Sequence, residues 1–156
     1  MRTVFWAGFW TFLLDQATKY LVVHGMDLMT RQEIDVLPPF LVFQMAWNRG
    51  VNFGLGAQAD VRWWLIGVAL AISAAVLVWL WRTGGTRAMQ ISAGLLVGGA
   101  LGNVVDRVLY GAVADFINMS CCGIRNPFAF NVADVAIFAG ALGLAFLPAQ
   151  QPKKAG

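Results

Sequence analysis

The chain has 156 residues and a formal net charge of +3, and 59% of its residues are hydrophobic while only 12% are charged. A soluble domain carries about 25% charged residues, so this composition excludes an ordinary soluble protein. It predicts a single integral membrane domain over residues 1–156. No run of basic residues is long enough to follow a phosphate backbone, so nucleic acid is not an expected partner.

The first predicted membrane span covers about residues 4–23 and contains Asp15 and Lys19. These two residues are four apart, which places their side chains on one face of a helix. An ionisable group inside a bilayer is costly and is usually partnered. We therefore expect a charge-neutralising pair here rather than a catalytic one.

The segment at about 25–60 contains no apolar run long enough to cross a bilayer, and it includes Pro38-Pro39. Apolar and polar residues alternate at 41–47, a pattern typical of short strands and turns. We expect this segment to lie on the outer membrane surface.

The second span is predicted at about 63–81, because tryptophan pairs flanked by arginine mark both of its membrane interfaces. The third, at about 88–108, carries glycines at every fourth position from Gly94 to Gly102, a spacing that lets another helix approach closely. The fourth covers about 128–147.

Four spans put both termini on one side, and the short basic connector between the second and third spans assigns that side to the cytoplasm.

Polar residues gather near the outer ends of the last two spans. Asn103, Asp106 and Arg107 lie three or four residues apart or adjacent, so they project from one side of the third span. Asn131 and Asp134 have the same three-residue spacing at the start of the fourth. The simplest interpretation of Asp106 is a structural partner of the adjacent arginine.

Asp115 and Asp134 are the strongest candidates for chemistry, since they fall in apolar stretches at the facing ends of the third and fourth spans. Two carboxylates that meet where the dielectric constant is low cannot both ionise cheaply, so the pair shares a proton near neutral pH. The ionised carboxylate can deprotonate a water while the protonated one polarises a peptide carbonyl. The pattern predicts aspartic-protease chemistry without deciding which aspartate is the base.

Cys121 and Cys122 are adjacent, so a disulfide between them would form a strained ring, and no metal-ligand spacing surrounds them. We interpret both as small apolar residues, and we expect no metal site.

Five short motifs follow one another along the chain: AspGlnAlaThrLys at 15–19, AsnArgGlyValAsnPheGly at 48–54, GlyGlyAlaLeuGlyAsnValValAspArg at 98–107, GlyAlaValAlaAspPhe at 111–116 and PheAsnValAlaAsp at 130–134. Taken together, they make nearly the whole chain similar to the lipoprotein signal peptidase family (signal peptidase II). Its members are membrane aspartyl proteases that cut signal peptides from bacterial prolipoproteins. One mild departure is Asn52, where a small residue is commoner in the family.

The resemblance implies that Asp115 and Asp134 form the catalytic dyad. It also implies that Asn103, Arg107 and Asn131 line the site and contact substrate. Further positions match family residues that support the site or its fold, with Asp106 matching an aspartate outside the dyad: Asp15, Lys19, Asn48, Gly50 and Asp106.

The implied fold is an all-α polytopic membrane protein with four transmembrane helices, an outer-leaflet β-cradle with a short surface helix from the 25–60 segment, and no cofactor. The implied substrate is a prolipoprotein whose cysteine already carries diacylglycerol, and the cut falls just before that cysteine. The resemblance places the chain in the bacterial cytoplasmic (inner) membrane with its active site near the outer face. Beyond this substrate and membrane lipid, it implies no obligate protein partner.

Two other classes of function remain as alternatives. A small proton-coupled transporter would use the intramembrane charges as a proton relay, but four spans without an inverted repeat argue against it. A purely structural membrane subunit would leave the clustered polar residues without a purpose. The relay would consist of Asp15, Lys19, Asp106, Arg107 and Asp134.

Overall fold

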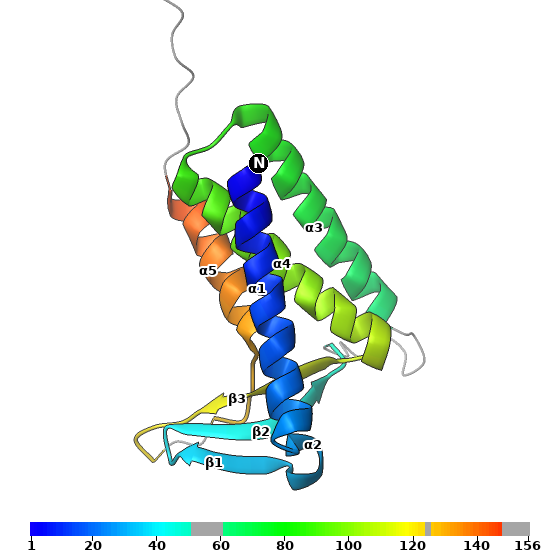
Figure 1. The fold of residues 1–156 in the computed structure, drawn as a ribbon, viewed down its shortest axis with the longest axis vertical. Helices are drawn as coiled ribbons and strands as arrows, with labels where there is room; N and C mark the ends of the chain where they lie inside the picture. The colour runs from blue at the N-terminus through cyan, green and yellow to red at the C-terminus, as the bar shows by residue number, and fades with distance from the viewer. Residues whose placement is uncertain (51–60, 124–125, 148–156) are drawn as a thin grey trace, which may run out of the picture.

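The computed structural model describes residues 1–50, 61–123 and 126–147. In this part of the chain, long helices stand side by side and a small antiparallel sheet lies across one end of the bundle (Figure 1). The N-terminus and the connector between α3 and α4 lie at the other end. The long helices are α1 (Arg2–Lys19), α3 (Val61–Thr83), α4 (Arg87–Tyr110) and α5 (Val132–Phe146).

Two of these helices, α3 and α4, are long and apolar enough to cross a membrane. They extend the spans predicted at 63–81 and 88–108 by no more than two residues at each end. Helix α1 has 18 residues and continues as a π-helix, η1 (Tyr20–Gly25), so the helical run begins and ends close to the predicted 4–23.

The fourth predicted span begins too early. Helix α5 starts at Val132 and not at residue 128, because the backbone of Asn131 is extended and its side chain caps the helix. Phe130 is apolar but exchanges backbone hydrogen bonds with Ile117, which holds it beside a strand. With 15 residues, α5 is shorter than the 20 positions assigned to it at 128–147.

Helix α4 packs against both α1 and α5, and its glycines make this possible. A Cβ built at Gly98 would lie 2.9 Å from the Cα of Gly8 in α1, closer than carbon atoms normally approach. A Cβ at Gly94 would lie 2.5 Å from the Cβ of Ala7 in the same helix. The predicted packing role of the glycine stripe is therefore confirmed, and its partner is α1.

The sheet has the order β1-β2-β3, and both of its strand pairs are antiparallel. Strands β1 (Glu33–Leu37) and β2 (Leu41–Asn48) come from the predicted outer segment, after a four-residue helix α2 (Leu28–Arg31). Strand β3 (Val113–Met119) follows α4 and was not expected from the sequence.

Gly111 makes the turn from α4 into β3, because its φ of +75° lies in the left-handed region that suits glycine. The cradle is thus built from two parts of the chain and not from residues 25–60 alone. Asn52 and the rest of residues 51–60 lie outside the described residues.

Candidate active site

Asp115 lies within β3, and this corrects the expectation that it stands at the end of a membrane span. Its backbone pairs with Ala46 of β2, and two residues later Ile117 pairs with Phe130 on the other side of the strand. Asp115 is only 3% exposed. Because β3 is hydrogen-bonded to β2 on one side and to Phe130 on the other, the Asp115 carboxylate has a fixed position at the sheet end of the helix bundle.

Asp134 lies in the first turn of α5, where its carboxylate and Asn131 cap the helix together. The backbone amide of Asp134 donates to Asn131 Oδ1 at 2.9 Å, and the backbone amide of Asn131 donates to Asp134 Oδ2 at 3.2 Å. The unpaired backbone amides at a helix N-terminus need acceptors, and the two side chains supply them here. Asp134 is half-buried and therefore keeps some access to solvent or substrate.

Asparagines supply a hydrogen bond to each oxygen of the two carboxylates. Asn131 Nδ2 donates to Asp115 Oδ1 at 2.6 Å, and Asn48 Nδ2 donates to Asp115 Oδ2 at 3.1 Å. Asn103 Nδ2 donates to Asp134 Oδ1 at 2.9 Å, and the remaining Oδ2 accepts from the Asn131 backbone. Asn131 therefore contacts both aspartates, which fixes their side chains relative to one another.

Burial and the nearby charge of Asp134 raise the pKa of Asp115 to about 6. Hydrogen bonds from Asn48 and Asn131 act in the opposite direction, because they favour the ionised carboxylate. Burial beside a second carboxylate is the condition under which two carboxyl groups can share a proton, and the sharing itself stays a prediction.

Asp15, Lys19 and Asp106 form a buried charge cluster next to these side chains. Lys19 Nζ lies 2.8 Å from Asp15 Oδ2, which confirms the predicted pair within the first helix. The same nitrogen lies 2.7 Å from Asp106 Oδ2. The expected partner of Asp106 was Arg107. Its ion pair is instead with Lys19, and Arg107 interacts with it electrostatically without forming an ion pair among the described residues.

Gln16 belongs to this cluster and was missed by the sequence reasoning. Its Nε2 donates to Asp15 Oδ2 at 3.1 Å and to Asp106 Oδ1 at 3.2 Å. The only signal in the sequence was its place between Asp15 and Lys19 in the first motif.

Arg107 and Gly50 occupy supporting positions. The Arg107 guanidinium interacts electrostatically with both Asp115 and Asp134, and its Nη1 donates to the Asn103 backbone carbonyl at 3.4 Å. Gly50, with a φ of +90°, donates its amide to Asn48 Oδ1 at 2.9 Å. This bond turns the amide group of Asn48 so that its nitrogen faces Asp115.

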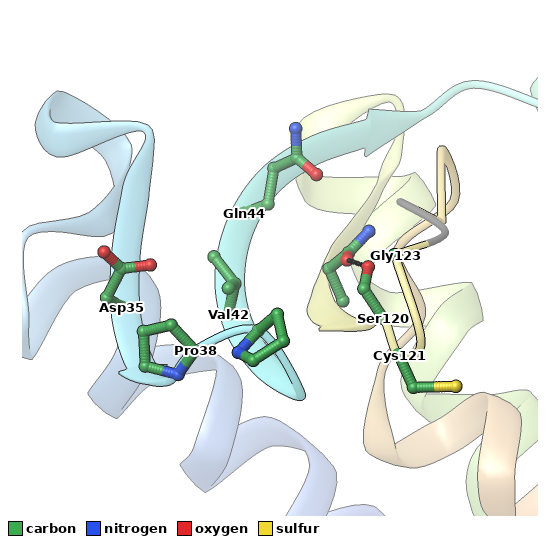
Figure 2. A pocket seen from close by; sticks show the side chains of 9 residues that line it. Asp35, Pro38, Val42, Gln44, Ser120, Cys121 and Gly123 are labelled. Atoms are coloured by element: carbon green, nitrogen blue, oxygen red, sulfur yellow. Dashed lines mark hydrogen bonds between the residues drawn. The ribbon is translucent and has the colours of Figure 1, made fainter.

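A cavity of about 360 Å³ lies away from this site, between the β1–β2 hairpin and the residues after β3 (Figure 2). Asp35, Pro38 and Val42 line one side, and Ser120 and Cys121 line the other. None of the sequence-predicted site residues lines it. Cys121 and its neighbour Cys122 are free and exposed, so they are not part of an apolar core.

Comparisons with known proteins identify the family of this chain. The family model described as signal peptidase (SPase) II matches residues 8–148. A lipoprotein signal peptidase of Methylobacterium sp. (strain 4-46) is 48% identical over 86% of this chain and 81% of that protein. One from Methylorubrum extorquens (strain PA1) is 46% identical over 86% of this chain and 78% of that protein. A bacterial membrane enzyme solved by the in meso method at 1.9 Å resolution superposes with a TM-score of 0.77 at 28% identity, covering 93% of this chain and 91% of that one.

Proposed function

Because this chain belongs to the signal peptidase II family, we propose that it cleaves prolipoproteins with a water activated by Asp115 and Asp134. Family membership itself gives the coarser activity: the chain is a bacterial membrane peptidase that removes signal peptides from prolipoproteins. The observation that carries the finer proposal is the position of Asn131, which hydrogen-bonds to both carboxylates.

The chemistry follows from two carboxyl groups that share one proton. The ionised group accepts a proton from a water held between the two, and the resulting oxygen nucleophile attacks the scissile carbonyl carbon. The protonated group donates to the carbonyl oxygen as negative charge develops there. The tetrahedral intermediate then collapses: the C–N bond breaks, the amine leaves with the proton taken from the water, and the carbonyl reforms as a carboxyl group while the second proton returns to the dyad. Asn48, Asn103 and Asn131 hold the carboxylates in place, so little reorganisation is needed when the charge moves. The mechanism uses only these groups and water, and it requires no cofactor.

Arg107 lies beside the dyad with a guanidinium that can bind a peptide carbonyl. Its Nε is buried without a hydrogen-bond partner among the described residues. A buried donor left unpaired is costly, so a substrate group that accepts from it would be favoured. We assign Arg107 to substrate binding and Asn131 to positioning of the dyad.

The substrate is proposed to be the diacylglyceryl form of the prolipoprotein, cut before the lipidated cysteine. Helices α1, α3, α4 and α5 would all cross the membrane, with both termini in the cytoplasm and the sheet at the outer face. The N-terminus and the α3–α4 connector lie at the end of the bundle opposite the sheet, and this supports that orientation. Acyl chains in the bilayer would hold the substrate at the membrane with about 0.8 kcal/mol per buried CH₂, which keeps it in the same plane as the enzyme.

The test is cleavage of a purified diacylglyceryl prolipoprotein by the wild type and by Asp115→Asn and Asp134→Asn in detergent. We expect the wild type to release the signal peptide and both variants, folded as judged by thermal unfolding, to release none. The same precursor without the lipid is the control and should remain uncut. Normal cleavage by either variant would contradict the dyad, and cleavage of the lipid-free precursor would contradict the substrate.

A further inference from the structure

One lysine joins two carboxylates that come from different helices. Lys19 Nζ lies 2.8 Å from Asp15 Oδ2 in α1 and 2.7 Å from Asp106 Oδ2 in α4. All three residues are at most 5% exposed. The cluster is therefore a shielded connection between helices rather than a surface ion pair.

Each of these carboxylates also accepts a hydrogen bond from a backbone amide. In both cases the amide belongs to the residue that immediately precedes one of the two proposed catalytic aspartates. Asp106 Oδ2 accepts from the amide of Ala114 at 3.2 Å, and Ala114 immediately precedes Asp115. Asp15 Oδ1 accepts from the amide of Ala133 at 2.9 Å, and Ala133 immediately precedes Asp134. Both alanines are almost completely buried. The lysine thus connects the two backbone positions that carry the dyad.

A third contact reaches the dyad through a side chain. Lys19 Nζ donates to Asn103 Oδ1 at 3.2 Å, and the Nδ2 of the same asparagine donates to Asp134 Oδ1 at 2.9 Å. The side-chain amide of Asn103 is planar, so a hydrogen bond from Lys19 to its oxygen also determines which way its nitrogen faces. The Asp15–Lys19–Asp106 cluster therefore orients Asn103 toward Asp134.

Charge neutralisation alone does not account for this arrangement. One acid four residues from Lys19 on α1 would already neutralise the lysine, and the guanidinium of Arg107 interacts electrostatically with the second acid, Asp106. Charge balance does not require a carboxylate oxygen at the backbone amide of Ala114. The hydrogen bond that this amide donates to Asp106 Oδ2 therefore indicates a positional role for the cluster.

We propose that Lys19 is a positioning residue that sets the separation of the Asp115 and Asp134 carboxylates by joining Asp106 and Asp15. This inference rests on the proposed function, because the separation matters only if the two aspartates act together. Strand β3 and helix α5 are separate elements, and the Asp106–Lys19–Asp15 bridge ties the amide before one aspartate to the amide before the other.

The decisive variant is Lys19→Arg, which keeps the positive charge but places a wider, planar group between the carboxylates. If Lys19 only neutralised charge, this variant would have the same kcat as the wild type. If it positions the dyad, kcat should fall about 100-fold with KM for the lipidated precursor little changed, since misplacement of reacting groups by about 1 Å costs that much. The upper pH limit of kcat should also move to lower pH, because carboxylates held farther apart repel each other less.

The control is Gly94→Ala, which disturbs the same α1–α4 contact far from the dyad. A Cβ there would lie 2.5 Å from the Cβ of Ala7, so thermal stability should fall while kcat per folded enzyme and its pH profile stay unchanged. If Lys19→Arg behaves like this control, or turns over at the wild-type rate, the proposal is overturned.

Asp106→Asn provides a second test if Lys19→Arg does not fold. The substitution keeps the length of the side chain but removes its charge and therefore the ion pair with Lys19, so kcat should fall with KM unchanged. Normal kcat in this variant would overturn the proposal. Wild-type enzyme is assayed in parallel with the lipidated precursor, and failure of that reaction would count against the proposed function instead.

Discussion

Asn131 and Asp134 cap each other: the amide of Asp134 donates to Asn131 Oδ1 at 2.9 Å, and the amide of Asn131 donates to Asp134 Oδ2 at 3.2 Å. This exchange fixes the start of α5 and the position of one carboxylate of the proposed dyad at the same time. The side-chain nitrogen of Asn131 remains free to donate to Asp115. Folding of the helix end and assembly of the site therefore use the same residue.

Replacement of Asn131 should separate these two roles. Asn131→Ala should lower the free energy of unfolding by about 1 kcal/mol through loss of the cap, and should also lower kcat. Asn131→Ser keeps a good capping oxygen but is too short to reach Asp115, so stability should be largely retained while kcat falls as in the alanine variant. Thermal unfolding and initial cleavage rates measure the two effects. A rise in KM with unchanged kcat would assign Asn131 to substrate binding instead.

Cleavage should depend on pH through the raised pKa of Asp115. Activity should decline as pH rises above about 6, the pKa of Asp115, because the dyad then loses its shared proton. Removing the charge of its neighbour with Asp134→Asn should lower the Asp115 pKa, which carbon-13 NMR of labelled aspartate can follow. An Asp115 that titrates near 3.8 in the wild type would contradict the assignment.

The same shift has a consequence for stability, with a defined sign. The folded state disfavours the ionised form of Asp115, so the contribution of this group to stability is largest at low pH. It should decrease as pH rises from 3.8, the ordinary pKa, to about 6, and should stay constant above that. Comparison of Asp115→Asn with the wild type over this range isolates the contribution, since the variant lacks the titration.

Asn48 should tune the upper pH limit of cleavage. Its hydrogen bond of 3.1 Å to Asp115 Oδ2 favours the ionised carboxylate and lowers the Asp115 pKa. Asn48→Ala should therefore raise that pKa and move the decline in activity to higher pH, which a pH profile of kcat would detect. Gly50→Ala tests the support for this side chain, because the φ of +90° at Gly50 strains any residue with a Cβ. A pH profile shifted to lower pH in Asn48→Ala would exclude this role.

Alanine substitution at two different glycines should have very different effects on the unfolding midpoint. Gly98→Ala places a Cβ 2.9 Å from the Cα of Gly8, and overpacking of this kind costs about 1–3 kcal/mol. Gly67→Ala in α3 meets nothing within 4 Å and should leave the unfolding midpoint unchanged or higher. Equal effects of the two substitutions on the midpoint in detergent would show that α1 and α4 do not approach as described.

The two cysteines offer a test of orientation, since they are the only cysteines in the chain and both are exposed. If the sheet faces the outside, a maleimide that cannot cross the cytoplasmic membrane should label Cys121 and Cys122 in intact cells. In a Cys121→Ser/Cys122→Ser background, Thr83→Cys at the exposed end of α3, next to the connector, should be labelled only after the membrane is permeabilised. The reverse pattern would invert the proposed topology.

Candidate residues for the site could be selected from the sequence because polar groups are rare and costly in an apolar chain. Asp15, Asn103, Asn131 and Asp134 stand out on that basis and do gather near one end of the bundle. What could not be predicted is how they pair. Asp106 is adjacent to Arg107, but successive residues on a helix point about 100° apart, and its ion-pair partner Lys19 comes from another helix.

The position of Asp115 was misjudged for a related reason. The apolar residues around it suit a membrane helix and a buried strand equally, and periodicity does not distinguish them over so short a run. The partner that makes the segment a strand is β2, whose Asn48 lies 67 residues earlier in the chain. Long-range pairing of this kind leaves no local signal, so the third strand of the cradle was missed.

The hydrogen bond from Ala133 to Asp15 links the first helix of the chain to the last, across 118 residues. In the proposed membrane topology, α1 is synthesised and inserted first, with Asp15 and Lys19 paired only to each other. The contacts that these two residues make with later helices cannot form until α4 and α5 have been inserted. If Asp115 and Asp134 form the proposed dyad, cleavage therefore begins only after α5 is in place.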